Sequence, residues 1–263
     1  MQHREMSIIQ FEIKKIIERK SLLIFLVVTV LLFPVLMAVG THVSVHSNQI
    51  SEGLFMEEVP YYIIRFSQSY FFIPVYILIF ASQEFSGGHV SRVVFLKSRK
   101  FYFASKIAYC CLISFLFSFL GLAALLLSKQ FSGFTGLLVS PAFYVEYVVS
   151  VFISSFAFSI LLLVLVFVLR TPWICFIFFI GWQTVEEIVF RIFYRLYNLK
   201  LVWLPFKSIQ LLFNKTIEDT DGSYRRLIIE FDYTLIIPFA YIILLILALY
   251  KYFLASDLKS LSD

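Results

Sequence analysis

Six segments of this chain are apolar and long enough to cross a lipid bilayer as helices, and this feature limits its fold more than any other. A hydrocarbon core about 30 Å thick requires roughly 20 apolar residues in helical form. Inside that core each backbone polar group must be paired within the protein, which helices achieve segment by segment. We therefore expect one all-α integral membrane domain over residues 1–263. The six segments are Ser21–Gly40, Tyr61–Ser82, Ala104–Ser128, Ala142–Leu169, Thr171–Phe190 and Thr234–Leu254.

The composition excludes an ordinary soluble domain. Of the 263 residues, 60% are hydrophobic and 15% are charged, whereas soluble domains carry about 25% charged residues. Residues 1–20 are rich in charge and have no small-residue cleavage site, so we expect the first apolar segment to be retained as a membrane helix. Cys110, Cys111 and Cys175 lie inside apolar segments, and we predict neither a disulfide nor a zinc site.

The lysines and arginines predict the topology. Five lie in residues 1–20 and four in the loop 83–103, whereas residues 41–60 contain none. Because such residues collect on the cytoplasmic side, we expect both termini in the cytoplasm. Residues 191–233, predicted to be external, are an exception with seven. The net charge of +5 is explained by these membrane flanks, and we expect no nucleic-acid partner.

Residues 1–20 have the pattern of an amphipathic helix. Isoleucines recur at spacings of three and four residues and alternate with charged side chains, which gives one apolar and one charged face. We expect an elbow helix in the cytoplasmic membrane interface; the alternative is a positively charged flank that only fixes topology. The residues concerned are Ile8, Ile9, Ile13, Lys14, Lys15, Ile16, Ile17, Glu18 and Arg19.

The loop 83–103 combines cationic and aliphatic residues. Gly87 and Gly88 break the preceding helix, and residues 89–97 restart with valines at helical spacing. Such a short helix fits a cleft in a partner protein, with the charges setting its orientation. The alternative is a positive-inside loop without a partner. The candidate contact residues are Glu84, His89, Val90, Arg92, Val93, Val94, Lys97 and Arg99.

Residues 191–233 are too long and too apolar for a simple external linker. The apolar stretches 190–204 and 206–213 are separated by Pro205 and contain polar residues that make a seventh crossing costly. We expect a re-entrant helical hairpin in the outer leaflet, between the fifth and sixth membrane helices. Irregular backbone at that depth requires protein or a wet cavity around it.

Glu186, Glu187 and Arg191 form an E-E-x-x-x-R string that resembles the first motif of CAAX-type intramembrane glutamate proteases. Those enzymes also need histidines on later helices. All four histidines precede the motif here, at positions 3, 42, 46 and 89. One alternative is an ion pair between Glu187 and Arg191, which are four residues apart; another is that the acidic residues form an outer gate. His42 and His46 lack a third ligand, so we predict no metal site.

Several short motifs resemble those of membrane (permease) subunits of type-2 ATP-binding-cassette (ABC) exporters. They are Glu84–His89, the Ser98–Arg99 pair, Lys106, the amphipathic Phe11–Lys15 and the Asp257–Leu258 pair. The resemblance implies that the loop 83–103 is a coupling helix seated in a cytoplasmic ATPase. It also implies a transport path shared with a second permease copy or a sister permease.

The chain has no G-x-x-x-x-G-K-[ST] phosphate loop, so ATP and Mg²⁺ are expected on a separate nucleotide-binding subunit. We expect no enzyme activity and no cofactor in this chain. The expected function is ATP-driven export across the bacterial inner membrane, by alternating access, of an amphipathic or hydrophobic substrate such as a peptide, lipid or antibiotic. The alternatives are the protease and a non-transporting membrane scaffold or sensor.

Overall fold

The structure is a computed structural model that describes residues 8–48, 72–85, 98–132, 141–169, 171–199, 201, 203–211, 216–218, 224–226 and 231–255. Its helices are α1 (Ile8–Glu18), α2 (Lys20–Asn48), α4 (Phe72–Phe85), α6 (Arg99–Ser132), α7 (Pro141–Leu169), α8 (Pro172–Tyr197), α9 (Pro205–Leu211) and α10 (Phe231–Ala255). Strands β1 (Thr216–Glu218) and β2 (Tyr224–Arg226) form an antiparallel pair. The membrane-spanning part is helical, as expected.

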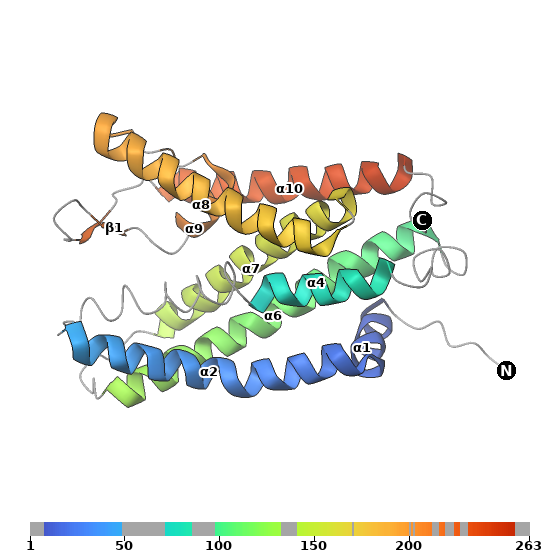
Figure 1. Ribbon diagram of the computed structural model, residues 1–263, viewed down its shortest axis with the longest axis horizontal. Coiled ribbons are helices and arrows are strands. Elements are labelled where there is room, and N and C mark those ends of the chain that lie inside the picture. The colour runs from blue at the N-terminus through green and yellow to red at the C-terminus, as the bar shows by residue number, and fades with distance from the viewer. Residues whose placement is uncertain are drawn as a thin grey trace.

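The long helices run back and forth between two ends of one bundle (Figure 1). One end of the bundle, which we name the α1 end, contains helix α1. The same end contains the last turns of α4, α7 and α10 and the first turns of α6 and α8. The opposite end, which carries β1, is named the β1 end. Helix α1 runs across the bundle rather than along it (Figure 1).

Within the described residues, four helices are long and apolar enough to cross a membrane. These spans are Lys20–Gly40, Arg99–Phe131, Tyr147–Leu169 and Pro172–Tyr197. The apolar stretch of α10, Ile236–Tyr252, is shorter, and α4 has 14 residues. The chain is therefore a multi-pass membrane protein. The first half of the expected segment Tyr61–Ser82 lies outside the described residues.

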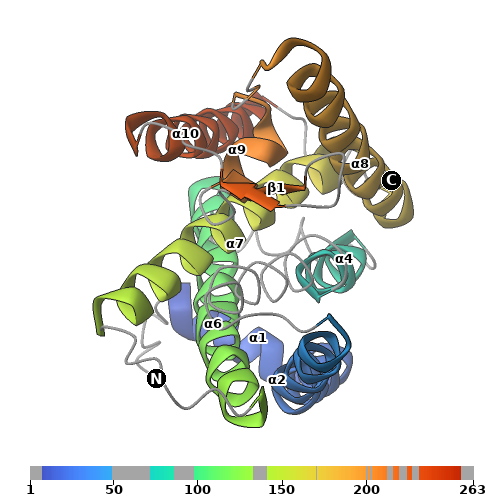
Figure 2. The same cartoon turned by 90° about the vertical axis from the view of Figure 1, so that its left-hand side faces the viewer.

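Helix α6 lies between α2 and α7, and α8, α9 and α10 lie on the far side of α7 (Figure 2). The contact of α2, α4 and α6 is aromatic: the ring of Phe33 lies 5.1 Å from Phe72 and 6.2 Å from Phe117. Helices α6 and α7 approach closely at Gly121, whose carbonyl accepts a hydrogen bond from the Tyr147 hydroxyl at 3.3 Å. Small residues allow such close packing between membrane helices.

The outward faces are apolar as well. Leu31 and Val35 on α2 and Val145 on α7 are among the exposed large apolar side chains. In lipid such faces need no cover, because the acyl chains are as apolar as leucine. The exposed apolar surface is therefore the one expected of helices that contact the bilayer.

Several element ends differ from the expectations; α2, for example, continues past Gly40 to Asn48. Helix α4 continues to Phe85 and α6 already begins at Arg99, where the Ser98 hydroxyl accepts the Phe101 N–H at 3.1 Å as a cap. The expected loop 83–103 is thus helical at both ends. Helix α8 runs unbroken past Phe190 to Tyr197 and ends at Asn198, which has a left-handed φ of 52°.

In the described part of segment 191–233, helix is found at the end of α8, up to Tyr197, in α9, and in the first residues of α10. Pro205, which was expected to separate two helical stretches, is the first residue of α9, a position that suits proline because its missing N–H is not needed there. Helix α9 spans seven residues, and the described part of the chain that follows is the β1–β2 pair, which was not predicted.

Candidate functional site

A buried cluster of charged and aromatic side chains joins α1, α4 and α6 at the α1 end. We name Glu12, Lys15, Phe80, Tyr102 and Lys106 the base cluster. The side chains of Glu12 and Lys106 are 0% exposed, and an oxygen of Glu12 lies 3.5 Å from the Lys106 ammonium nitrogen. Lys15 is 7% exposed. An ion pair without solvent contact loses its hydration and must be held by its surroundings.

Aromatic rings supply part of that support. The ring of Phe80 lies 4.7 Å from the Lys15 nitrogen and 4.4 Å from the Lys106 nitrogen. The ring of Tyr102 lies 4.6 Å from the Lys106 nitrogen. The face of an aromatic ring attracts a cation, most strongly where water is excluded. One ring of α4 therefore holds a lysine of α1 and a lysine of α6 together.

The electrostatics of α1 reflect this burial. Loss of hydration, followed by the nearby Lys106 ammonium, holds the pKa of Lys15 well below its usual range, although Glu12 acts in the opposite direction. Burial also lowers the pKa of Arg19, one turn further along the chain. The α1 contact thus places basic side chains where hydration is poor, which favours the neutral form of Lys15.

The base cluster lies near the end of α4 and the start of α6, the two helix ends that flank residues 86–97 in the sequence. Phe80 precedes the end of α4 at Phe85, and Tyr102 lies in the first turn of α6. Both helical stems of the segment 86–97 are thereby fixed to α1.

The structure places two of the predicted loop residues. Glu84 lies in the last turn of α4, and Arg99 opens α6 with a partly exposed side chain. The other predicted residues lie outside the described part of the chain: His89, Val90, Arg92, Val93, Val94 and Lys97. Asp257 and Leu258 lie outside it as well.

Two of the motifs noted in the sequence meet in space. The Phe11–Lys15 motif of α1 reaches Lys106 through Glu12, and the rings of Phe11 and Phe101 pack edge to face at 5.6 Å. The sequence analysis missed Phe80 and Tyr102 as members of the cluster. The available signal was Lys106 itself, because a lysine within an apolar membrane segment needs an electron-rich partner.

A second polar group lies on α8, towards the β1 end. Glu186 is 5% exposed, and its Oε2 accepts the backbone N–H groups of Phe206 at 2.8 Å and Lys207 at 3.1 Å. Its Oε1 accepts the Trp182 indole N–H. The first N–H groups of a helix lack partners in the helix, and Leu204, the residue before α9, has no side-chain acceptor. Glu186 therefore caps α9 from another helix.

Glu187 forms a pair of ionic contacts beside this cap. Its carboxylate lies 2.9 Å from the Arg191 Nε and 2.7 Å from the Lys207 ammonium nitrogen. That ammonium also lies 4.4 Å from the centre of the Phe190 ring. The expected Glu187–Arg191 pair is present, and with Glu186 and Lys207 it forms what we name the α8–α9 anchor. Because three donors occupy the Glu186 oxygens, the geometry favours anchoring over activation of a water nucleophile.

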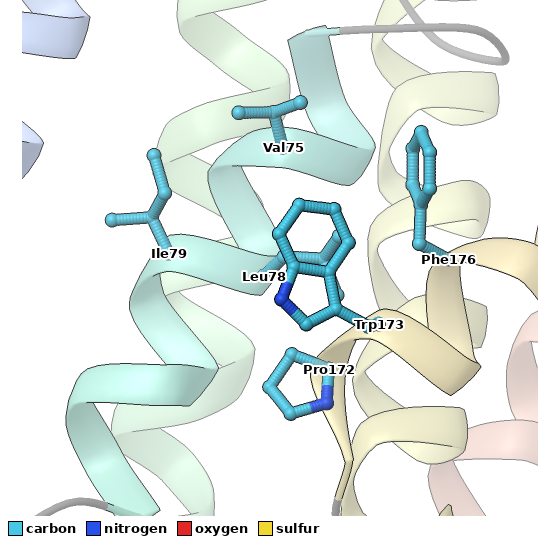
Figure 3. A pocket seen from close by; sticks show the side chains of 6 residues that line it. All are labelled: Val75, Leu78, Ile79, Pro172, Trp173 and Phe176. Carbon is cyan, nitrogen blue, oxygen red and sulfur yellow. The ribbon is translucent and has the colours of Figure 1, made fainter.

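An apolar groove lies between α4 and the start of α8 (Figure 3). It is near the turn that joins α7 to α8, at the α1 end. Figure 3 shows the indole of Trp173 and the ring of Pro172 beside α4. The groove could accept a hydrocarbon group. Its lining residues are Val75, Leu78, Ile79, Pro172, Trp173 and Phe176.

In the described part of the chain, no three His, Cys, Asp or Glu side chains are grouped as metal ligands would be. Cys110, Cys111 and Cys175 are free thiols. Comparison with known proteins found no matching family model, no matching curated protein and no matching solved structure.

Proposed function

We propose that this chain is the permease subunit of an ATP-driven ABC exporter in the bacterial inner membrane. The observation that carries the proposal is the base cluster, which fixes both stems of the basic segment 86–97 to α1 through buried contacts. A loop whose positive charge only fixes the membrane topology does not require its flanking helices to be held by buried contacts. A loop that transmits force from a partner protein to the membrane helices does require such contacts.

The proposed mechanism is mechanical. Residues 89–97 would seat in a cleft of a separate nucleotide-binding subunit, with valines buried and Arg92, Lys97 and Arg99 at the rim. ATP binding and hydrolysis occur on that subunit, together with its Mg²⁺. Closure of two such subunits would push on the stems, and the base cluster would move α1, α4 and α6 as one body.

The proposal includes six crossings and cytoplasmic termini. The four long spans are completed by α10 and by the segment that ends in α4. In Figure 1 α1 and the last turn of α10 lie at the same end of the bundle, as an even number of crossings requires. The Tyr252 hydroxyl donates to the Phe167 carbonyl at that end.

The substrate is proposed to be hydrophobic or amphipathic. The α4–α8 groove is lined by apolar side chains, which suits a lipid, an apolar peptide or a hydrophobic antibiotic better than a sugar or an ion. A second permease copy or a sister permease would provide the other half of the path. At the opposite end, Glu186, Glu187 and Arg191 hold α9 as part of an outer gate.

The test uses charge reversal at the two ends of one helix. Arg99 opens α6 and Lys129 lies in its last turn, about 45 Å away at 1.5 Å per residue. The full chain is purified with its ATPase from the source cells and reconstituted in liposomes. Arg92→Glu combined with Arg99→Glu should abolish assembly with the ATPase and stimulated ATP turnover, whereas Lys129→Glu should leave both intact.

Unchanged assembly and turnover in the double variant would contradict the coupling role of the loop. Transport by the chain without any ATPase would contradict the proposal as a whole. Purification from the source cells without an ATPase would favour the alternative of a membrane scaffold or sensor.

A further inference from the structure

Gln183 is a buried amide without a partner inside a membrane-spanning helix. It lies on α8, its side chain is 3% exposed, and neither its amide nitrogen nor its amide oxygen has a hydrogen-bond partner in the structure. Primary amides carry two donors and two acceptors. Buried amides in native proteins almost always form hydrogen bonds with some of these groups. An amide without a partner costs more free energy within a membrane.

The neighbours of Gln183 show which way it faces. Phe179 and Glu186 lie one turn before and one turn after it on the buried face of α8. The ring of Phe179 packs 5.0 Å from the ring of Phe206 in α9, and Glu186 accepts the Phe206 N–H. Gln183 therefore lies towards the start of α9.

A second buried polar group without a partner lies on α7. The Ser159 hydroxyl of α7 is buried and also lacks a hydrogen bond. Its neighbour in the chain, Phe158, packs 5.9 Å from Phe179 and 5.6 Å from Phe206. We name these three rings the aromatic junction, because they join α7, α8 and α9. Unpaired polar atoms thus lie on two helices that meet at one junction.

The charges nearby define the chemistry of the missing partner. Glu186, Glu187, Arg191 and Lys207 contribute two negative and two positive groups, and they contact one another or the start of α9. No net charge remains in the α8–α9 anchor to attract an ion. The partner must be neutral, small, and both a donor and an acceptor. Water meets these conditions, and buried water commonly binds polar groups that the protein leaves unpaired.

We propose that Gln183 holds an ordered internal water at the aromatic junction, between α8 and the start of α9. This water hydrates one point of the contact between α8 and α9, within the membrane. Water exchanges its hydrogen bonds readily, so α9 can shift against α8 without leaving the amide unpaired. The proposal does not depend on an ATPase partner.

X-ray radiolytic footprinting of the full chain in lipid nanodiscs tests this directly. Activated water hydroxylates rings beside it, even when bulk solvent cannot reach them. Phe206 and Phe179 should be hydroxylated in the wild type well above Phe33, which is equally buried and packs against other aromatic rings. In ¹⁸O water the added oxygen should carry the label.

Two variants localise the signal. Gln183→Leu should reduce the hydroxylation of Phe206 and Phe179 to the level of Phe33. Thr184→Val is the control, because Thr184 is exposed on α8 and its hydroxyl donates to Ile180 of the same helix; its labelling should match the wild type. Wild-type labelling no higher than that of Phe33 would overturn the proposal even if Gln183→Leu fails to fold. Undiminished labelling in a folded Gln183→Leu variant would overturn it as well.

Discussion

The Glu12 carboxylate of α1 and the Lys106 ammonium of α6 lie 3.5 Å apart, and neither side chain is exposed. The two residues are 94 positions apart in the sequence. Their pairing fixes a short helix that runs across the bundle to the start of a membrane-spanning helix. Because a buried charge that loses its partner is far more costly than an exposed one, this contact is a sensitive point of the fold.

Glu12→Gln should destabilise the protein strongly. The substitution removes the carboxylate that lies 3.5 Å from the buried Lys106 ammonium nitrogen. Breaking a buried pair in this way costs about 3–5 kcal/mol. The loss is measured as a lower unfolding temperature and a lower denaturant midpoint in detergent or nanodiscs.

The matched control is Glu18→Gln on the same helix. Glu18 pairs with Lys14 at 3.6 Å, but both side chains are largely exposed, so the loss should be no more than about 1 kcal/mol. Equal effects of the two substitutions would mean that the Glu12–Lys106 pair contributes no more than a surface contact.

Glu186→Ala should loosen α9. Without the carboxylate, the N–H groups of Phe206 and Lys207 lose their acceptor, and loss of a helix cap typically costs about 0.5–2 kcal/mol. Hydrogen–deuterium exchange over residues 205–211 should therefore become faster, while exchange in α6 remains unchanged.

Glu186→Gln is the companion to that experiment. Its amide oxygen can still accept one or both N–H groups, so exchange in α9 should lie between the wild type and Glu186→Ala. Slow exchange in Glu186→Ala would show that α9 does not depend on this cap.

Gly121→Leu should separate α6 from α7. A Cβ atom at this position would lie 3.2 Å from the Tyr147 hydroxyl oxygen, and a larger side chain has no room. Overpacking of this kind typically costs about 1–3 kcal/mol, and thermal unfolding in nanodiscs measures it. Gly181→Leu on α8 is the control, because a Cβ atom there would meet nothing within 4 Å. A comparable loss at both positions would contradict the close contact of α6 and α7.

The element ends show where sequence patterns were insufficient. Hydropathy placed the end of the fifth segment at Phe190, yet α8 continues to Tyr197 because its last turns are supported by the α8–α9 anchor. The sequence predicted a break at Pro205, since proline acts locally on its own backbone, and α9 begins at that residue. The acceptor that completes that start, Glu186, comes from 20 residues earlier in the chain and could not be assigned from sequence.

The amino-acid sequence by itself determined that this protein lies in a membrane, because the cost of placing a helix in lipid is a sum over consecutive residues. It also determined that α1 is amphipathic, which depends only on spacing along one helix. Tertiary structure alone decided that Glu12 meets Lys106 beside Phe80 and Tyr102, and that Gln183 faces α9 without a partner. These relationships depend on which helix faces pack together, and packing joins residues whose separation in the sequence carries no record of the contact.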